Sequence, residues 1–312
     1  MQITRDYQFA DPQDRGASAA IGNFDGVHLG HQAVIDIARN HADKLGCPLG
    51  VVTFVPHPRA YFAPDAPAFQ LMNAEARASQ LQKIGVQKLY ELNFNNILSN
   101  LTAEEFASNV IRDGLGLKHV VIGADFHFGK GRSGNAADLV RFGAEMGFGV
   151  TVADLIEVGN GQVSSTAIRD ALADGRPRHA AKMLGHWHRI EGEVIRGDQR
   201  GRELGFPTAN MSITGLHPPK FGVYAVKIDI LDGPHAGTYD GAASMGTRPM
   251  FGENRPNLET FILDFQGDIY GCHVSVALVE HLRPEEKFDS LEALITQMNA
   301  DVVLVREILA NA

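Results

Sequence analysis

The chain has 312 residues, which is enough for two domains that each bury a core. A hydrophobic share of 44% and a charged share of 21% are typical of a folded globular protein and exclude the collagenous and disordered classes. The chain has 37 acidic residues and 28 Lys and Arg, so its net charge is -9. A protein with this charge has no overall positive field that would attract nucleic acid or an anionic membrane. Anionic small molecules are still possible ligands, because an acidic protein can have a locally positive site.

The cysteine content and the absence of long apolar runs indicate where such a protein works. Cys47 and Cys272 lie far apart and form no Cys-x-x-Cys pair, which is typical of buried thiols in a reducing compartment. The N-terminus has no apolar leader, and no run approaches the ~20 apolar residues of a spanning helix. We therefore expect a cytoplasmic protein with small-molecule ligands and without nucleic-acid or membrane partners. Weak self-association stays open.

The first half alternates short apolar runs with amphipathic stretches. The predicted strands are Ala19–Phe24, Gly50–Phe54, Leu89–Phe94, His119–Gly123 and Gly149–Leu155, and the predicted helices are Gln32–Lys44, Ala74–Ile84, Glu104–Leu115 and Ala136–Met146. Such alternation predicts an α/β fold with a doubly wound parallel sheet. Ligands of such sheets bind at the carboxyl ends of the strands, so the loop after the first strand is the first candidate site.

The second half has short β-rich runs with few helices between them. These runs are Arg189–Ile195, Val223–Ile230, Tyr239–Ser244, Glu259–Phe265 and His273–Val279. They predict a compact antiparallel β-barrel, which a terminal helix over Ser290–Leu309 follows. We place the domain boundary between residues 183 and 184, so the predicted domains are 1–183 and 184–312.

Glycines and two histidines follow the first predicted strand, at the start of a helix. Because His28 and His31 are three residues apart, both can face one anion at the helix N-terminus. A turn residue and a helix cap without chemical role are the alternative, but the position in the fold and the flanking glycines favour a phosphate-binding loop. The predicted phosphate-binding residues of this loop are Gly22, Asn23, Phe24, Asp25, Gly26 and Gly30. The His-x-Gly-His pattern resembles the signature of the nucleotidyltransferase superfamily.

A second polar segment, Ser164, Ser165, Thr166 and Arg169, follows the last predicted strand of this half. Serine and threonine are common helix caps, which is the alternative explanation. Hydroxyl groups, helix N–H groups and an arginine can also surround a triphosphate, and the pattern resembles the motif that closes the nucleotidyltransferase ATP site. We therefore predict that the first loop and this segment bracket one crevice.

Residues 129–134 match the Gly-x-Gly-x-x-Gly pattern of dinucleotide-binding enzymes, and Asp154 follows about twenty residues later, as that pattern requires. A dehydrogenase is therefore an alternative. Residues 124–128 separate this pattern from the preceding strand, however, so the tight strand-to-helix turn is missing. A dehydrogenase would also leave the two histidines unexplained.

The second half contains a further polar constellation. Thr208 and Asn210 are two positions apart, so in an extended strand both can present neutral oxygens on one face to a hard cation such as Mg²⁺. Gly201 and Gly205 can fold a loop over phosphates, although ordinary turns also use glycine. Glu259 stands in an otherwise apolar strand, as an exposed carboxylate or as a general base.

Together these segments resemble the family of bifunctional bacterial riboflavin kinase/FAD synthetases. The resemblance covers most of the chain and includes Gly-Phe-Pro-Thr-Ala-Asn over residues 205–210, a pattern specific to riboflavin kinases. It implies that ATP phosphorylates riboflavin to FMN in the barrel. It also implies that a second ATP adenylylates FMN to FAD in the N-terminal domain, with release of pyrophosphate.

The resemblance also implies roles for individual residues. Glu259 matches the family's kinase base, and Thr208 and Asn210 match its Mg²⁺ ligands. His28 and His31 are the catalytic residues of the adenylyl transfer, and Arg169 with the serine–threonine segment contacts ATP. The implied flavin-binding residues are Asp125, Phe126, Phe128, Phe206 and Pro207.

The chain departs from the family pattern at several positions. Met250 replaces a threonine, Val55 and Ala124 stand where an acid is common, and His127 stands where arginine is common. A flavin-binding or regulatory protein with inactive sites would explain these departures and is the third hypothesis. The bifunctional enzyme explains all the polar constellations together.

Overall fold

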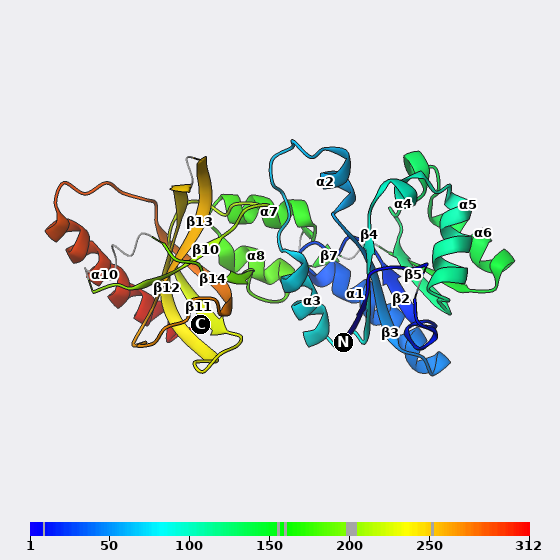
Figure 1. Cartoon of the computed structure of the whole chain (residues 1–312), viewed down its shortest axis with the longest axis horizontal. Coiled ribbons are helices and arrows are strands. Elements are labelled where there is room, and N and C mark those ends of the chain that lie inside the picture. The colour runs from blue at the N-terminus through cyan, green and yellow to red at the C-terminus, as the bar shows by residue number, and fades with distance from the viewer. Residues whose placement is uncertain (9, 155–156, 159–160, 198–204, 251–252) are drawn as a thin grey trace. The chain divides into compact units, whose positions relative to one another are not determined.

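The computed structural model describes residues 1–312 except 9, 155–156, 159–160, 198–204 and 251–252. Its contacts divide the chain into two compact units (Figure 1). One comprises Met1–Ala66 and Arg77–Val163, and the other comprises Pro67–Ala76 and Ser164–Ala312. Contacts thus group residues 164–183 with the second unit. The predicted domain boundary between residues 183 and 184 stays a prediction.

The elements up to residue 163 alternate between strands and helices, as predicted. The strands are β1 Gln2–Thr4, β2 Ser18–Ile21, β3 Leu49–Val55, β4 Lys88–Asn93, β5 His119–Gly123, β6 Gly149–Ala153, β7 Glu157–Val158 and β8 Gly161–Gln162. The helices are η1 Pro12–Asp14, α1 Leu29–Leu45, α2 Pro58–Phe62, α3 Ala74–Lys83, α4 Asn96–Asn100, α5 Ala103–Glu105, η2 Phe106–Gly114, η3 Lys130–Arg132 and α6 Ala136–Met146. Of the predicted strand Gly149–Leu155, the end at Leu155 lies outside the described residues.

The sheet of the first unit is parallel and has the order β1-β4-β3-β2-β5-β6. From β2 the chain builds toward β3 and β4, and it then returns to the other side of β2 to add β5 and β6. Right-handed crossovers in two directions place helices on both faces, so the predicted doubly wound fold is confirmed. The switch in direction lies between β2 and β5, where open α/β sheets bind their ligands.

One predicted helix differs in type from the expectation. The helix expected over Glu104–Leu115 is a π-helix from Phe106 onward, and its final turn closes with the N–H of Leu115 donating to the Val110 carbonyl at 2.8 Å. Val110 and Ile111 are nonetheless fully buried. Apolar spacing identifies the inward face but does not encode the extra residue in each turn.

Two stacked histidines lie inside the first unit, away from the loops that sequence singled out. The rings of His41 on α1 and His119 on β5 have centroids 3.6 Å apart. The Nε2 atoms of His119 and His41 lie 2.8 Å and 3.2 Å from the Thr151 hydroxyl oxygen. Burial, together with His41, lowers the pKa of His119 to about 4.

Acidification should therefore destabilise the chain through His119. Its pKa of about 4 in the folded protein lies below the ordinary 6.5, so the unfolded chain takes up the proton first. The stabilisation that neutral His119 contributes above pH 6.5 is lost as the pH falls toward 4. For His119 alone, we expect a loss of about 2 kcal/mol in the free energy of unfolding between about pH 7.5 and about pH 5. Urea unfolding at both pH values measures it.

The matched variants are His119→Gln, which keeps a hydrogen-bonding group toward Thr151, and His127→Gln at an exposed histidine of the same unit. His119→Gln should remove this part of the pH dependence, whereas His127→Gln should retain it. Equal pH dependence in the wild type and His119→Gln would contradict the assignment.

The second unit contains two helices followed by a barrel of six antiparallel strands. Its elements are α7 Ser165–Ala173, α8 Pro177–Leu184, β9 Arg189–Glu193, β10 Thr208–Ser212, β11 Gly222–Ile230, β12 Gly237–Met250, β13 Glu253–Ile262, β14 His273–Arg283 and α10 Leu291–Leu309. The strand order is β10-β13-β12-β11-β14-β9. A bridge between Ile195 and Asn210 brings the two edges together, so the barrel is nearly closed. The predicted antiparallel barrel with a terminal helix is confirmed.

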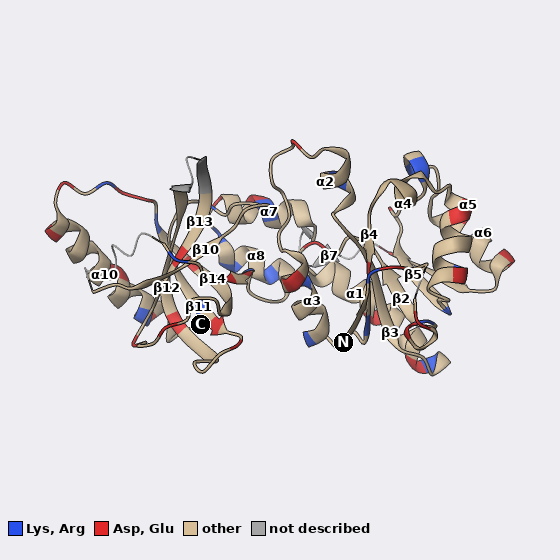
Figure 2. Cartoon of the chain, in the orientation of Figure 1, with Lys and Arg blue, Asp and Glu red and all other residues tan. Residues whose placement is uncertain are grey.

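The terminal helix packs on the barrel mainly through its second half. Val305 and Leu309 are buried, whereas Leu291 at its start is 56% exposed. An ion pair between Arg283 and Asp301, at 2.8 Å, joins the helix to β14. Figure 2 shows residues of both charge signs interspersed along the helices and strands. Within the described ranges, no helix is long and apolar enough to cross a membrane.

Candidate active sites

The predicted phosphate loop connects β2 directly to α1, at the switch in the sheet. Its residues Phe24, Gly26 and Val27 have positive φ angles of 50°, 90° and 43°. Such angles are strained for Phe24 and Val27, whose side chains are 1% and 0% exposed. Core packing therefore holds the backbone of this turn in an unusual shape, which is common at sites that bind ligands.

The two histidines lie together where α1 begins. Their rings stack with centroids 3.6 Å apart, and His28 Nδ1 accepts a hydrogen bond from the His31 N–H at 3.3 Å. A Cβ at position 30 would lie only 3.2 Å from the His28 ring, so the absence of a side chain at Gly30 leaves room for this ring. Burial, and secondly His28, lowers the pKa of His31 well below its ordinary value. The structure thus brings the predicted imidazole pair together at a helix N-terminus.

The remaining predicted residues of this loop lie in the same turn. The Thr53 hydroxyl donates to the Asn23 carbonyl at 3.1 Å, which ties the loop to β3. Asp25 is 4% exposed. A Cβ at Gly22 would approach the Phe24 ring to 3.3 Å. Phe24 itself is a buried support that lies 5.1 Å from His31, measured between ring centroids.

The predicted flavin residues of the first unit follow β5, on the other side of the switch. The Phe126 N–H donates to the Gly123 carbonyl at 3.1 Å, and the Phe126 and Phe128 rings stack with centroids 5.6 Å apart. Phe128 is 6% exposed and belongs to the core, whereas Asp125 is exposed. Nδ1 of His127, one of the departures from the family pattern, lies 2.8 Å from the Asp125 carbonyl oxygen.

An aromatic cluster at the carboxyl ends of β3 and β4 was missed by the sequence reasoning. Tyr61 and Phe62 on α2 lie 5.3 Å and 5.7 Å from Phe94, between ring centroids, and Phe54 lies 5.8 Å from it. Phe62 is 68% exposed, which is unusual for a large apolar side chain. The adjacent aromatic pair after the second predicted strand was the signal that could have found this cluster.

The serine–threonine segment opens helix α7. Ser164 caps it by accepting the Ala167 N–H at 3.2 Å, and the first helical residues are Ser165 and the exposed Thr166. Arg169 Nε donates to the Phe69 carbonyl at 2.6 Å. The capping role is therefore observed in the structure, and a role in ATP binding stays a prediction.

Because this segment belongs to the second unit and the histidine loop to the first, a crevice shared by the two stays a prediction.

The glycines of the dinucleotide-like pattern have a packing role in this structure. A Cβ at Gly129 would lie 2.6 Å from the Ala103 backbone nitrogen, and one at Gly134 would lie 2.6 Å from the Ala103 side chain. The helix that follows starts only after Asn135, which caps α6. The pattern is therefore not the strand-to-helix phosphate turn that a dehydrogenase needs.

In the barrel, the three predicted catalytic and metal-binding residues lie on adjacent strands. Asn210 pairs directly with Glu259, and Thr208 pairs with Phe261, between β10 and β13. Directly paired residues of antiparallel strands project to the same face, with Cβ atoms about 4.5–5.5 Å apart. Asn210 is 6% exposed, and Glu259 is half-buried. The structure thus brings Thr208, Asn210 and Glu259 to one face.

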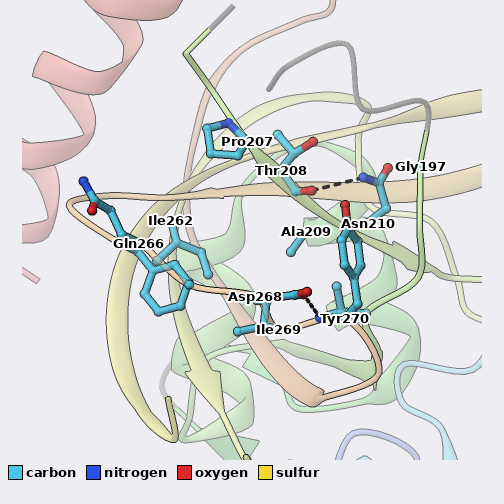
Figure 3. A pocket seen from close by; sticks show the side chains of 13 residues that line it. Gly197, Pro207, Thr208, Ala209, Asn210, Ile262, Gln266, Asp268, Ile269 and Tyr270 are labelled. Atoms are coloured by element: carbon cyan, nitrogen blue, oxygen red, sulfur yellow. Dashed lines mark hydrogen bonds between the residues drawn. The ribbon is translucent and has the colours of Figure 1, made fainter. Parts of the chain in front are cut away.

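These strands border a cavity of ≈ 440 Å³ (Figure 3). Gly197, Thr208 and Asn210 line one part of it, and the turn from Phe265 to Tyr270 lines another. The Asn210 amide donates to the Thr208 carbonyl at 3.3 Å, as the dashed line in Figure 3 shows. The cavity is large enough for a small-molecule ligand.

Of the other predicted barrel residues, Pro207 also lines this cavity. Phe206 is 8% exposed and meets Phe261 with ring centroids 5.1 Å apart, while Pro207 is exposed. Gly205 is exposed with a φ of 85°. Gly201 lies outside the described residues, as does the side chain of Met250.

Comparisons with known proteins agree with this arrangement. The family model for FAD synthetase matches residues 10–167, and the one for riboflavin kinase matches residues 184–309. The bifunctional riboflavin kinase/FMN adenylyltransferase of Pseudomonas fluorescens is 41% identical over 311 residues, covering 99% of this chain and 98% of that one. The protein of the same name from Escherichia coli K12 is 37% identical over 296 residues, covering 95% and 93%.

A solved structure shares the fold of the whole chain. It is described as a macrolide-efflux protein from Streptococcus pneumoniae, is 32% identical and covers 98% of both chains with a TM-score of 0.82. Two enzyme families thus match the two halves that carry the histidine loop and the Thr208–Asn210–Glu259 face. The chain belongs to the family of bifunctional riboflavin kinase/FMN adenylyltransferases, with an N-terminal FAD synthetase half and a C-terminal riboflavin kinase half.

Proposed function

We propose that this chain phosphorylates riboflavin to FMN in the barrel and adenylylates FMN to FAD in the N-terminal unit, using ATP in both reactions. The observation that carries the proposal is one strand face: Thr208 and Asn210, which line the cavity, share it with Glu259 on the adjacent strand. The match of the riboflavin kinase family model to the same strands supports it.

In the kinase reaction, a ribityl hydroxyl attacks the γ-phosphate of ATP and must lose its proton. Glu259 is the base that takes this proton, because it is the carboxylate directly opposite Asn210. ATP occupies the cavity next to Thr208 and Asn210. Phe206 and Pro207 offer an apolar surface to the flavin ring.

The residues of this face fit Mg²⁺ as the ion bound with ATP. Thr208 and Asn210 provide neutral oxygens on one side of β10, which suits a hard cation held largely by phosphates. A Cβ at Gly197 would lie 2.6–2.7 Å from the Asn210 amide atoms, so this glycine keeps the space beside the amide open. Among the described residues no group of three His, Cys, Asp or Glu could hold a metal. When bound, Mg²⁺ neutralises charge on the transferring phosphate.

Thr208→Ala and Asn210→Ala should each raise the Mg²⁺ concentration needed for half-maximal FMN formation, by roughly tenfold. Each variant removes an oxygen near the ion, so excess Mg²⁺ should restore part of the rate. Initial rates over a Mg²⁺ titration measure this. Ser212→Ala, at the exposed end of the same strand, is the control and should titrate like the wild type. Unchanged Mg²⁺ dependence in both site variants would contradict the proposed ligands.

The adenylyl transfer needs charge stabilisation rather than a strong base. The FMN phosphate is already an anion when it attacks the α-phosphate of ATP, and pyrophosphate leaves. His28 and His31 lie at the N-terminus of α1, where they and the helix N–H groups stabilise the negative charge that develops. Ser164, Ser165, Thr166 and Arg169 contact the triphosphate. FMN binds by the loop with Asp125, Phe126 and Phe128.

One incubation separates the hypotheses. Purified chain is mixed with riboflavin, ATP and Mg²⁺, and the products are resolved by chromatography. FMN and FAD are the expected products. Flavin that is retained without conversion would favour the binding protein with inactive sites, and nicotinamide turnover in a parallel assay would favour a dehydrogenase.

The setting that we propose for both reactions is the cytoplasm. Two cysteines that are far apart in the sequence suit a reducing compartment. Weak self-association is compatible with both reactions, since each proposed site is built from residues of one chain.

A further inference from the structure

We infer that Asn257 is a positioning residue of the kinase reaction, which fixes Asn210 and Glu259 relative to each other. This inference rests on the proposed function of those two residues. Asn257 lies on β13, two residues before Glu259, and pairs with Ser212 of β10. It therefore shares the face on which Asn210 and Glu259 lie.

A single amide group connects the two functional side chains. Asn257 Nδ2 donates to Asn210 Oδ1 at 3.2 Å and to Glu259 Oε1 at 3.3 Å. Both partners are acceptors, so rotating the amide by a half turn would bring oxygen against oxygen twice. The network therefore fixes the orientation of the amide. The Asn257 NH₂ group has two protons, and each is donated to one of the two side chains, Asn210 and Glu259.

The environment of Asn257 argues against a purely structural role. Asn257 is only 4% exposed, and its buried Oδ1 atom accepts no hydrogen bond from any of the described residues. A buried acceptor without a partner weakens a fold, so stability alone does not account for this amide. The lost stability is recovered if a water or hydroxyl group that enters with the substrates donates a hydrogen bond to Asn257 Oδ1. ATP with its hydrated ion and riboflavin both bring such groups.

The arrangement also explains what the amide contributes to the rate. Asn210 belongs to the ATP side of the reaction, and Glu259 belongs to the hydroxyl side. Because one rigid amide connects them, the distance between the phosphate and the base is set before the substrates arrive. Small displacements of such groups lower rates strongly, because the reacting atoms must meet within a narrow range of geometry.

The test uses Asn257→Leu in the full-length chain, since leucine has a similar shape but donates no hydrogen bond. We expect kcat for FMN formation to fall by roughly 10- to 100-fold, with the KM for riboflavin changed by less than about threefold. The melting temperature should stay within about 3 °C of the wild type. FAD formation from FMN, which uses the other unit, should be unchanged. The matched control is Ser212→Ala, the strand partner of Asn257, which should retain the wild-type kcat.

A double-mutant cycle separates positioning from a general effect on the fold. If Asn257 acts through Glu259, adding Asn257→Leu to Glu259→Gln should lower kcat further by less than about threefold. Independent losses that multiply would overturn the inference, as would a normal kcat in Asn257→Leu. If Glu259→Gln itself forms FMN at the wild-type rate, the proposed base and this inference both fail. A slow Glu259→Gln together with a normal Asn257→Leu overturns the positioning role alone.

Discussion

Glu259→Gln should slow the formation of FMN by about 10²–10⁴-fold, which is the range for loss of a general base. Glutamine keeps the shape of the side chain and can still accept the hydrogen bond from Asn257, which lies 3.3 Å from Glu259 Oε1 in the wild type. It cannot take the proton of the ribityl hydroxyl. The loss should therefore appear in kcat, while the KM for ATP stays near the wild-type value. Initial rates with riboflavin and ATP as the variables measure both.

The second reaction of the same protein is the internal control. Glu259→Gln supplied with FMN should form FAD at the wild-type rate, because the histidine loop lies in the other unit. Near-normal kinase turnover in Glu259→Gln would remove Glu259 from the mechanism. Its position in the strand would then be that of a solvated carboxylate.

His28→Ala and His31→Ala should each abolish most FAD formation while FMN formation persists. Removing one preorganised donor to a developing phosphoryl charge costs on the order of 3 kcal/mol, or about a hundredfold in rate. His28 also caps α1 by accepting the His31 N–H, so its loss affects the helix as well as the chemistry.

The variant His28→Asn distinguishes these two effects. Asparagine is a good helix cap but has no imidazole, so His28→Asn should restore the stability lost in His28→Ala without restoring FAD formation. Circular dichroism and separate assays of the two reactions provide the measurements. A folded variant that loses both activities would show that the histidines do not serve the adenylyl transfer alone.

The position of the histidine loop between a strand and a helix could be predicted from the sequence because the pattern is local. Glycines and histidines between a strand and a helix are confined to one turn, and the structure stacks His28 on His31 there. Spacing could not reveal that Phe24 and Val27 adopt strained angles. That strain is held by core contacts from residues that are distant in sequence.

The aromatic surface around Phe94 shows the opposite situation. Phe54 lies on β3, Tyr61 on α2 and Phe94 just after β4, and each looks like an ordinary core residue in its own segment. Only the parallel pairing of β3 with β4 brings them to one edge and leaves Phe62 exposed.

The sequence by itself determined the two-part α/β and barrel architecture and the place of His28 and His31 in a strand-to-helix loop. It also predicted Thr208, Asn210 and Glu259 as the reactive set of the kinase half. These features depend on periodicity and on short motifs, which the order of residues contains. Tertiary structure alone decided that Glu259 lies opposite Asn210 and that Asn257 connects them. The physical reason is that strand register joins residues almost fifty positions apart, and hydrophobic packing of the entire barrel sets that register.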